Sequence, residues 1–82
     1  MMVTVRLFSD LVQHLPTGAT GKRAQVELPE GATVLTLIEA LGIPFEISEG
    51  MIGIALNDEV SHHEVRLRDG DRVSLFPALA GG

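Results

Sequence analysis

The sequence predicts a single α+β domain in which one main helix packs on a mixed sheet of four to five strands. The chain has 82 residues, a length that suits one domain. Short alternating apolar segments lie on both sides of one clearly amphipathic segment, which indicates strands flanking a helix. Hydrophobic residues make up 45% of the chain, enough for one compact core. A chain this small has no room for a deep catalytic cleft beside that core.

The first strand is predicted over residues 2–8. Its two faces carry Val3, Val5 and Leu7 on one side and Thr4, Arg6 and Phe8 on the other. Ser9 is then predicted to cap a short helix, which ends before the glycine-containing loop at residues 16–21. Residues 22–28 alternate again and predict a second strand, antiparallel to the first.

The main helix is predicted to begin after Thr33, a favourable N-cap residue. Its apolar residues fall at i, i+3, i+4 and i+7 and form one stripe: Val34, Leu37, Ile38 and Leu41. Gly42 and Pro44 are placed to end the helix. The stripe must therefore lie on a sheet.

The second half of the chain predicts an irregular segment over residues 45–50 and a buried strand over 51–56. Turn residues at 57–58 precede a short return strand over 59–62, and the turn at 69–71 precedes the last strand over 72–76, which Pro77 ends. Strand, strand, helix, strand, short strand, strand is the order of a β-grasp (ubiquitin-like) roll. We therefore predict a β-grasp domain over residues 1–77 and a flexible tail over 78–82.

Composition excludes several functions. The chain has no cysteine, so disulfides, thiolate metal sites and a cysteine nucleophile are excluded. A net charge of −5 argues against nucleic acid and favours a partner with a basic docking surface. Apolar runs are too short to span a membrane, and the N-terminus lacks a signal-peptide core. We expect a cytoplasmic protein.

No motif predicts a bound metal or cofactor. Neighbouring residues on a strand point to opposite faces, so His62 and His63 are poorly placed to share one ion and are interpreted as solvated turn residues. Gly18 and Gly21 match a nucleic-acid-clamping spacing, but a plain loop fits the acidic chain better.

The feature with chemical potential is the terminal pair Gly81 and Gly82, which follows a strand and a short tail. A carboxylate becomes an acylating agent once ATP adenylates it, and a sulfur nucleophile then converts it to a thiocarboxylate. Glycines lack a Cβ and can thread a narrow channel in a partner's active site. The alternative is an incidental frayed end.

Docking would come from the folded body. Phe76 is out of phase with Val73 and Leu75, as Phe8 is with its own strand. If the two strands are neighbours, these rings form one exposed apolar patch of the kind found at interfaces. The alternative is that they close a minor core.

Residues 69–77 (DGDRVSLFP), followed by Gly81 and Gly82, resemble the C-terminal block of MoaD/ThiS-type sulfur carriers. Asn57 and residues 5–8 are similar to the same family, so the resemblance spans nearly the whole chain. Within the family it is closest to MoaD, the small subunit of molybdopterin synthase. The resemblance implies that the carrier is a co-substrate without activity of its own, adenylated by an E1-like enzyme of the MoeB/ThiF type that uses ATP.

The resemblance also assigns roles to residues. Gly82 would carry the thiocarboxylate and Gly81 would thread the partner, a molybdopterin synthase large subunit of the MoaE type or another sulfur acceptor. The implied partner-binding positions are Phe8, Val60, Phe76, Pro77, Leu79 and Ala80. MoaD proteins commonly carry two prolines after the phenylalanine, whereas Ala78 follows Pro77 here. Thiamine synthesis, tRNA thiolation and covalent protein modification therefore remain alternatives.

Overall fold

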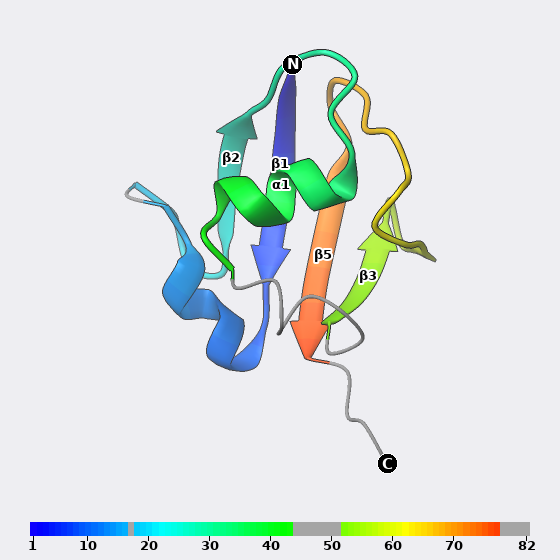
Figure 1. Cartoon of the computed structure of the whole chain (residues 1–82). Helices are drawn as coiled ribbons and strands as arrows, with labels where there is room; N and C mark the ends of the chain where they lie inside the picture. The colour runs from blue at the N-terminus through cyan, green and yellow to red at the C-terminus, as the bar shows by residue number, and fades with distance from the viewer. Residues whose placement is uncertain (17, 44–51, 78–82) are drawn as a thin grey trace.

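The computed structural model describes residues 1–16, 18–43 and 52–77. One helix crosses one face of a five-stranded sheet (Figure 1). The strands are β1 (Met2–Leu7), β2 (Arg23–Glu27), β3 (Ile52–Leu56), β4 (Glu59–Val60) and β5 (Arg72–Pro77), and the helices are the 3₁₀ helix η1 (Ser9–His14) and α1 (Val34–Ala40). The predicted α+β architecture is confirmed.

The sheet is mixed, with strand order β2-β1-β5-β3-β4. β1 and β5 run parallel at its centre, with Leu7 beside Leu75, and all other neighbours are antiparallel. The C-terminal ends of β1 and β5 therefore lie at the same end of the sheet. This arrangement places residues 8 and 76, which follow the last parallel pair, next to each other.

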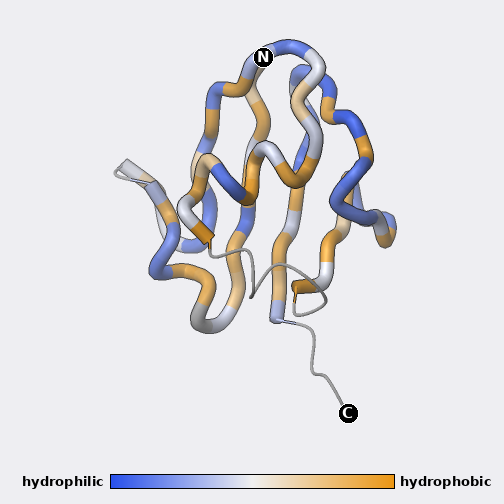
Figure 2. Tube along the Cα trace, in the orientation of Figure 1, coloured by the Kyte–Doolittle hydropathy of each residue, from blue (hydrophilic) through white to orange (hydrophobic). Residues whose placement is uncertain are grey.

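The core lies between α1 and the sheet. Apolar and polar positions alternate along the strands (Figure 2). The predicted inner face is confirmed, because the alternating apolar residues are buried: Val3, Val5, Leu7, Ile52, Ile54, Val73 and Leu75. From the helix, Val34, Leu37 and Ile38 are buried against them, while Leu41 is partly buried at the helix C-cap.

Both ends of α1 are satisfied by hydrogen bonds. Thr33 is the N-cap as predicted, and its hydroxyl accepts from the Thr36 amide at 3.3 Å. The first two helical amides donate outside the helix, to the carbonyls of residues 65 and 63 at 3.0 Å each. At the other end, the amides of Gly42 and Ile43 donate to the carbonyls of Glu39 and Ile38, the Schellman pattern, with Gly42 at φ +76°.

Ser9 does not cap η1, and that prediction is wrong. The N-cap is Phe8, whose backbone is extended and whose amide donates to the Leu75 carbonyl at 3.2 Å. The ladder to β5 thus keeps the chain extended through Phe8, and the turn begins one residue later. Ser9 consequently lies inside the helix at φ +55° and caps nothing.

Strand bounds differ slightly from the predictions. β2 is shorter than residues 22–28, and β4 ends at Val60 instead of His62. Pro77 belongs to β5 as its last residue, opposite Ile52. A proline lacks an amide donor, so a strand end is where a ladder tolerates it. The predictions for residues 45–50 and for the tail at 78–82 lie outside the described residues.

The β3–β4 turn depends on Asn57. Asn57 and Asp58 have φ of +51° and +72°, the left-handed region that a tight hairpin turn requires. The Asn57 side chain also accepts from the Arg72 amide at 2.9 Å and donates to Asp71 at 3.1 Å. We expect Asn57→Ala to lower the free energy of unfolding by about 1–3 kcal/mol, measured by urea titration.

Asn57→Gly separates the two causes of that loss. Glycine tolerates the positive φ but removes both side-chain hydrogen bonds. If the bonds matter, Asn57→Gly is also destabilised, though less than Asn57→Ala. Equal stability of wild type and both variants would contradict this account of the turn.

Candidate docking surface

The sheet face opposite α1, here called the open face, carries the outward side chains of the strands. They are exposed or half-buried, whereas the inward side chains of the two central strands are buried. In sequence order the open face comprises Met2, Thr4, Arg6, Phe8, Arg23, Gln25, Glu27, Gly53, Ala55, Val60, Arg72, Ser74 and Phe76.

Phe8 and Phe76 lie side by side on the open face, at the end of the sheet where β1 and β5 finish. The Phe8 amide bonds to the carbonyl of residue 75, which fixes the two strands next to each other. Phe76 is 37% exposed and Phe8 is half-buried. The two strands are neighbours, which is the condition under which one aromatic patch was expected, and neither ring is fully buried.

Gly53 lies directly beneath the Phe76 ring. The two residues are opposite each other on β3 and β5, and a Cβ added to Gly53 would collide with three ring atoms of Phe76. Gly53 is not in the left-handed region, so its backbone does not require glycine. Its function in the strand is to leave space for the aromatic ring. Sequence analysis missed this role, although a glycine inside an apolar strand signals a close approach.

Val60 extends the apolar surface to the sheet edge. It lies opposite Ala55, which in turn lies opposite Ser74 on the other side, so Val60 shares the open face with Phe76. Val60 is 92% exposed. All three body positions named from the family resemblance, Phe8, Val60 and Phe76, therefore lie on one face.

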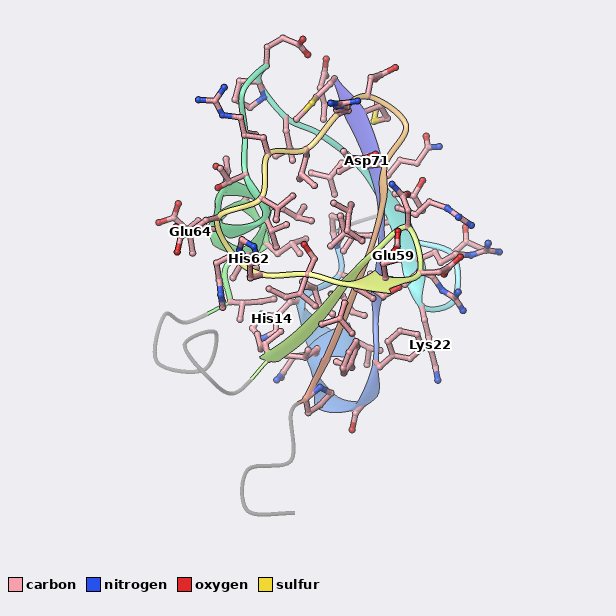
Figure 3. All side chains as sticks on the ribbon, turned by 90° about the vertical axis from the view of Figure 1, so that its right-hand side faces the viewer. His14, Lys22, Glu59, His62, Glu64 and Asp71 are labelled. Carbon is pink, nitrogen blue, oxygen red and sulfur yellow. The ribbon has the colours of Figure 1, made fainter. Side chains whose placement is uncertain are left out.

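Two cations lie over the Phe8 ring. The Arg6 Cζ is 5.4 Å from the ring centroid and the Lys22 Nζ is 5.7 Å from it. Figure 3 shows Lys22 on the side of the sheet away from α1. Cation–π contacts of this length hold charged groups at the edge of an apolar surface. Sequence analysis missed them, because Lys22 reaches Phe8 only through the pairing of β1 with β2.

The tail begins at the same end of the sheet as the two rings. Pro77, the last residue of β5, is half-buried opposite Ile52. Leu79, Ala80, Gly81 and Gly82 lie outside the described residues. Because residue 78 follows Pro77 directly, a partner that docks on Phe8 and Phe76 meets the start of the tail next to its docking site.

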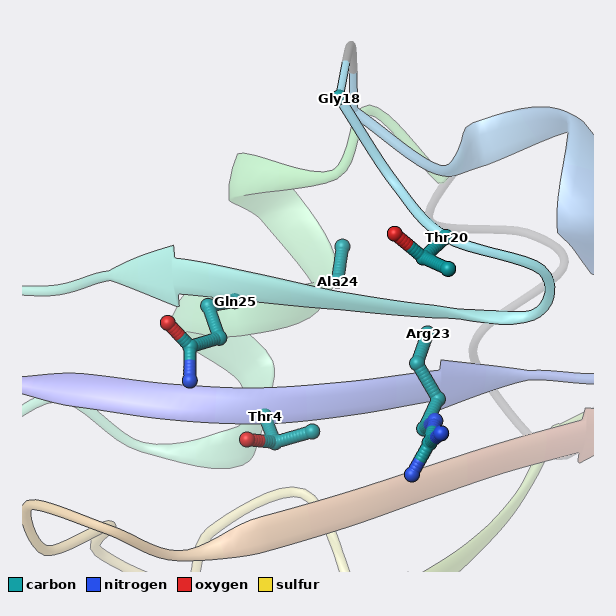
Figure 4. Close-up of a pocket in the computed structure, with 6 residues that line it drawn as sticks. All are labelled: Thr4, Gly18, Thr20, Arg23, Ala24 and Gln25. Carbon is teal, nitrogen blue, oxygen red and sulfur yellow. The ribbon is translucent and has the colours of Figure 1, made fainter.

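A hollow of about 480 Å³ lies beside β2, lined by Thr4, Gly18, Thr20, Arg23, Ala24 and Gln25 (Figure 4). These lining residues are mostly polar with one charge, and they do not include the pair of acid and base that catalysis needs. His62 and Glu64 lie near α1, away from this hollow (Figure 3). Within the described ranges, no three His, Asp or Glu residues are grouped to hold a metal ion.

One helix on a mixed five-stranded sheet, with exposed apolar side chains on the open face, defines a β-grasp, ubiquitin-like protein. The chain belongs to the ThiS family, whose family model matches residues 7–82. It is thus a ubiquitin-like sulfur carrier of the ThiS/MoaD type. No helix in the described part of the chain is long and apolar enough to cross a membrane.

Solved structures agree with this assignment. The chain is 30% identical to a chain of the BexX/CysO complex of Amycolatopsis orientalis (TM-score 0.60, covering 98% of this chain and 99% of that one). It is 28% identical to a chain of the complex of subunits 1 and 2 of the molybdopterin-converting factor of Helicobacter pylori (TM-score 0.61, 100% of both chains). Small archaeal modifier protein 1 of Haloferax volcanii shares the fold at 22% identity (TM-score 0.71, 95% and 98%). Among curated proteins the comparison finds no match.

Proposed function

We propose that the chain donates sulfur from a thiocarboxylate at Gly82 in molybdopterin synthesis. The observation that carries the proposal is the family match, which extends through Gly82. The similarity to a chain of a molybdopterin-converting factor complex supports molybdopterin synthesis as the pathway that receives the sulfur. Under this proposal the large subunit is the enzyme and this chain is its sulfur-donating partner, in the cytoplasm where ATP is available.

The chemistry needs two steps on the terminal carboxylate. A carboxylate oxygen of Gly82 attacks the α-phosphorus of ATP, which forms an acyl adenylate and releases pyrophosphate. Hydrosulfide then attacks the acyl carbon, AMP leaves with the electron pair of the broken C–O bond, and the thiol proton is lost to water. The product is a thiocarboxylate, whose sulfur is nucleophilic. The activating enzyme supplies ATP binding and catalysis, and this chain supplies the carboxylate.

The open face provides the binding energy that offsets the cost of ordering the tail. Ordering residues 79–82 in a partner's channel costs roughly 4–8 kcal/mol, at about 1–2 kcal/mol of backbone entropy per residue. Apolar contacts of Phe8, Phe76 and Val60 must offset that cost. The remaining affinity is then moderate, which suits a carrier that has to move from the activating enzyme to the sulfur acceptor.

The test is intact-mass spectrometry of the chain after incubation with ATP, an E1-like adenylating enzyme from the same genome and sulfide. We expect the mass to rise by the difference between one sulfur and one oxygen atom. A chain lacking Gly81 and Gly82 keeps the folded body and should show no change. An unchanged mass of the wild type, with an enzyme that is active on its own carrier, would reject the proposal.

The client pathway is tested separately. Thiocarboxylated chain mixed with a MoaE-type large subunit and the sulfur-free pterin precursor should yield the dithiolene, and failure there with success in thiazole formation or tRNA thiolation would assign one of those alternatives. A protein modifier would instead leave Gly82 in isopeptide linkage to lysine in cell lysate. Digestion and peptide mass spectrometry detect that linkage.

A further inference from the structure

Three cations gather at one end of the open face. Arg6 and Arg23 lie directly opposite each other on β1 and β2, and Lys22 precedes Arg23 in the chain. Arg6 and Lys22 both lie over Phe8. These residues, Arg6, Lys22 and Arg23, form what we call the cationic rim, which borders the aromatic pair.

Among the side chains that the structure describes, none forms an ion pair with the cationic rim. The ion pairs in the described part of the chain join the N-terminal amine to Glu30 and Arg72 to Asp58, and neither involves the rim. Glu27 also lies on β2, but it is opposite Met2, about 13 Å along the strand from Arg23 at roughly 3.3 Å per residue. That separation exceeds the Debye length of about 8 Å at physiological ionic strength.

The rim therefore works against folding in the free chain. Like charges directly opposite each other in a sheet are destabilising. A cluster of three cations is also unusual in a chain that has only six lysines and arginines and a net charge of −5. Half of its lysines and arginines thus lie at one site, and no ion pair among the described side chains neutralises them. An external group of negative charge would relieve the repulsion.

We propose that the cationic rim binds carboxylates on a protein partner, so that the pocket receiving Phe8 and Phe76 is bordered by aspartate or glutamate. The occupant is a protein because the rim continues into the apolar surface of Phe76 and Val60, which needs an apolar counterpart. The net charge alone suggested a basic docking surface on the partner. The rim is positively charged, opposite in sign to the net charge of the chain, and under this proposal the rim determines which charge on the partner lies next to it. This inference rests on the proposed function, which supplies the docking partner.

The test compares two double variants with the same change of charge. Arg6→Gln/Arg23→Gln removes two charges from the rim, and Arg66→Gln/Arg68→Gln removes two from exposed positions between β4 and β5. Association with the activating enzyme is followed by stopped-flow fluorescence from low to high salt. We expect the rim variant to associate about ten- to a hundred-fold more slowly at low salt, and the difference to disappear at high salt. The control should stay near wild type.

Each result has a defined meaning. Equal association rates of the two double variants would overturn the proposed role of the cationic rim. If the mass of the wild type still shows activation of Gly82, the proposed function stands. If wild type neither binds nor is adenylated, both fail. Tighter binding of a single-stranded oligouridine than of the enzyme would assign the rim to nucleic acid instead. Independently of any partner, Arg23→Gln should raise the urea midpoint of the free chain, and a lowered midpoint would contradict the repulsion.

Discussion

Gly53→Val is expected to weaken binding of the activating enzyme by about ten- to a hundred-fold while leaving the chain folded. The Phe76 ring lies over Gly53, so a valine side chain must displace it. Losing a central aromatic contact typically costs about 2 kcal/mol or more, and every 1.4 kcal/mol is tenfold in affinity. The backbone of residue 53 accepts valine, which favours strands. Titration calorimetry measures the affinity, and circular dichroism confirms the fold.

A double-mutant cycle shows whether Gly53 acts through the ring. If it does, Gly53→Val combined with Phe76→Ala binds no more weakly than Phe76→Ala alone. Gln25→Val is the matched control, since it places the same side chain on the same face but on β2, two strands away from β5. Additive losses in the cycle, or an equal loss in the control, would show that Gly53 does not position Phe76.

Leu37→Ala is expected to lower the free energy of unfolding by about 2–5 kcal/mol. Leu37 lies on the face of α1 that packs on the sheet and is fully buried, and the helix is too short to form without that packing. The whole domain is stabilised by only about 4–12 kcal/mol, at roughly 0.05–0.15 kcal/mol per residue, so the loss is a large share. Urea titration gives the difference directly.

Val12→Ala is the control for that experiment. Val12 lies in η1 and is 37% exposed, so its truncation leaves no buried cavity. We expect a change within about 0.5 kcal/mol. A loss below about 1 kcal/mol for Leu37→Ala would mean that the helix contributes little to the core.

The parts of the fold that follow from local patterns could be predicted from the sequence. Alternation of Val3, Val5 and Leu7 gives the inner face of β1, and the stripe beginning at Val34 gives the buried side of α1. These patterns hold because burial selects one face of a strand or helix. Ser9 was misjudged because its conformation depends on the bond from Phe8 to a strand that lies far along the chain.

The docking surface could be predicted only in part for the same reason. The phase of Phe8 and Phe76 against their own strands is visible in the sequence, and so was the possibility that the strands are neighbours. The contact of Gly53 with Phe76 depends on the β3–β5 register, and the cationic rim depends on the β1–β2 register. No local pattern fixes those registers, so both features needed the structure.

The parallel pairing of β1 with β5 has a consequence for synthesis of the chain. β1 is synthesised first but cannot complete its pairing until β5 is synthesised, because β5 lies between β1 and β3. A nascent chain that ends before residue 72 leaves β1 and β3 with unpaired edges, which promote aggregation or degradation. Folding thus acts as a proofreading step: a chain passes it only after translation has delivered β5, the strand that leads directly into the tail.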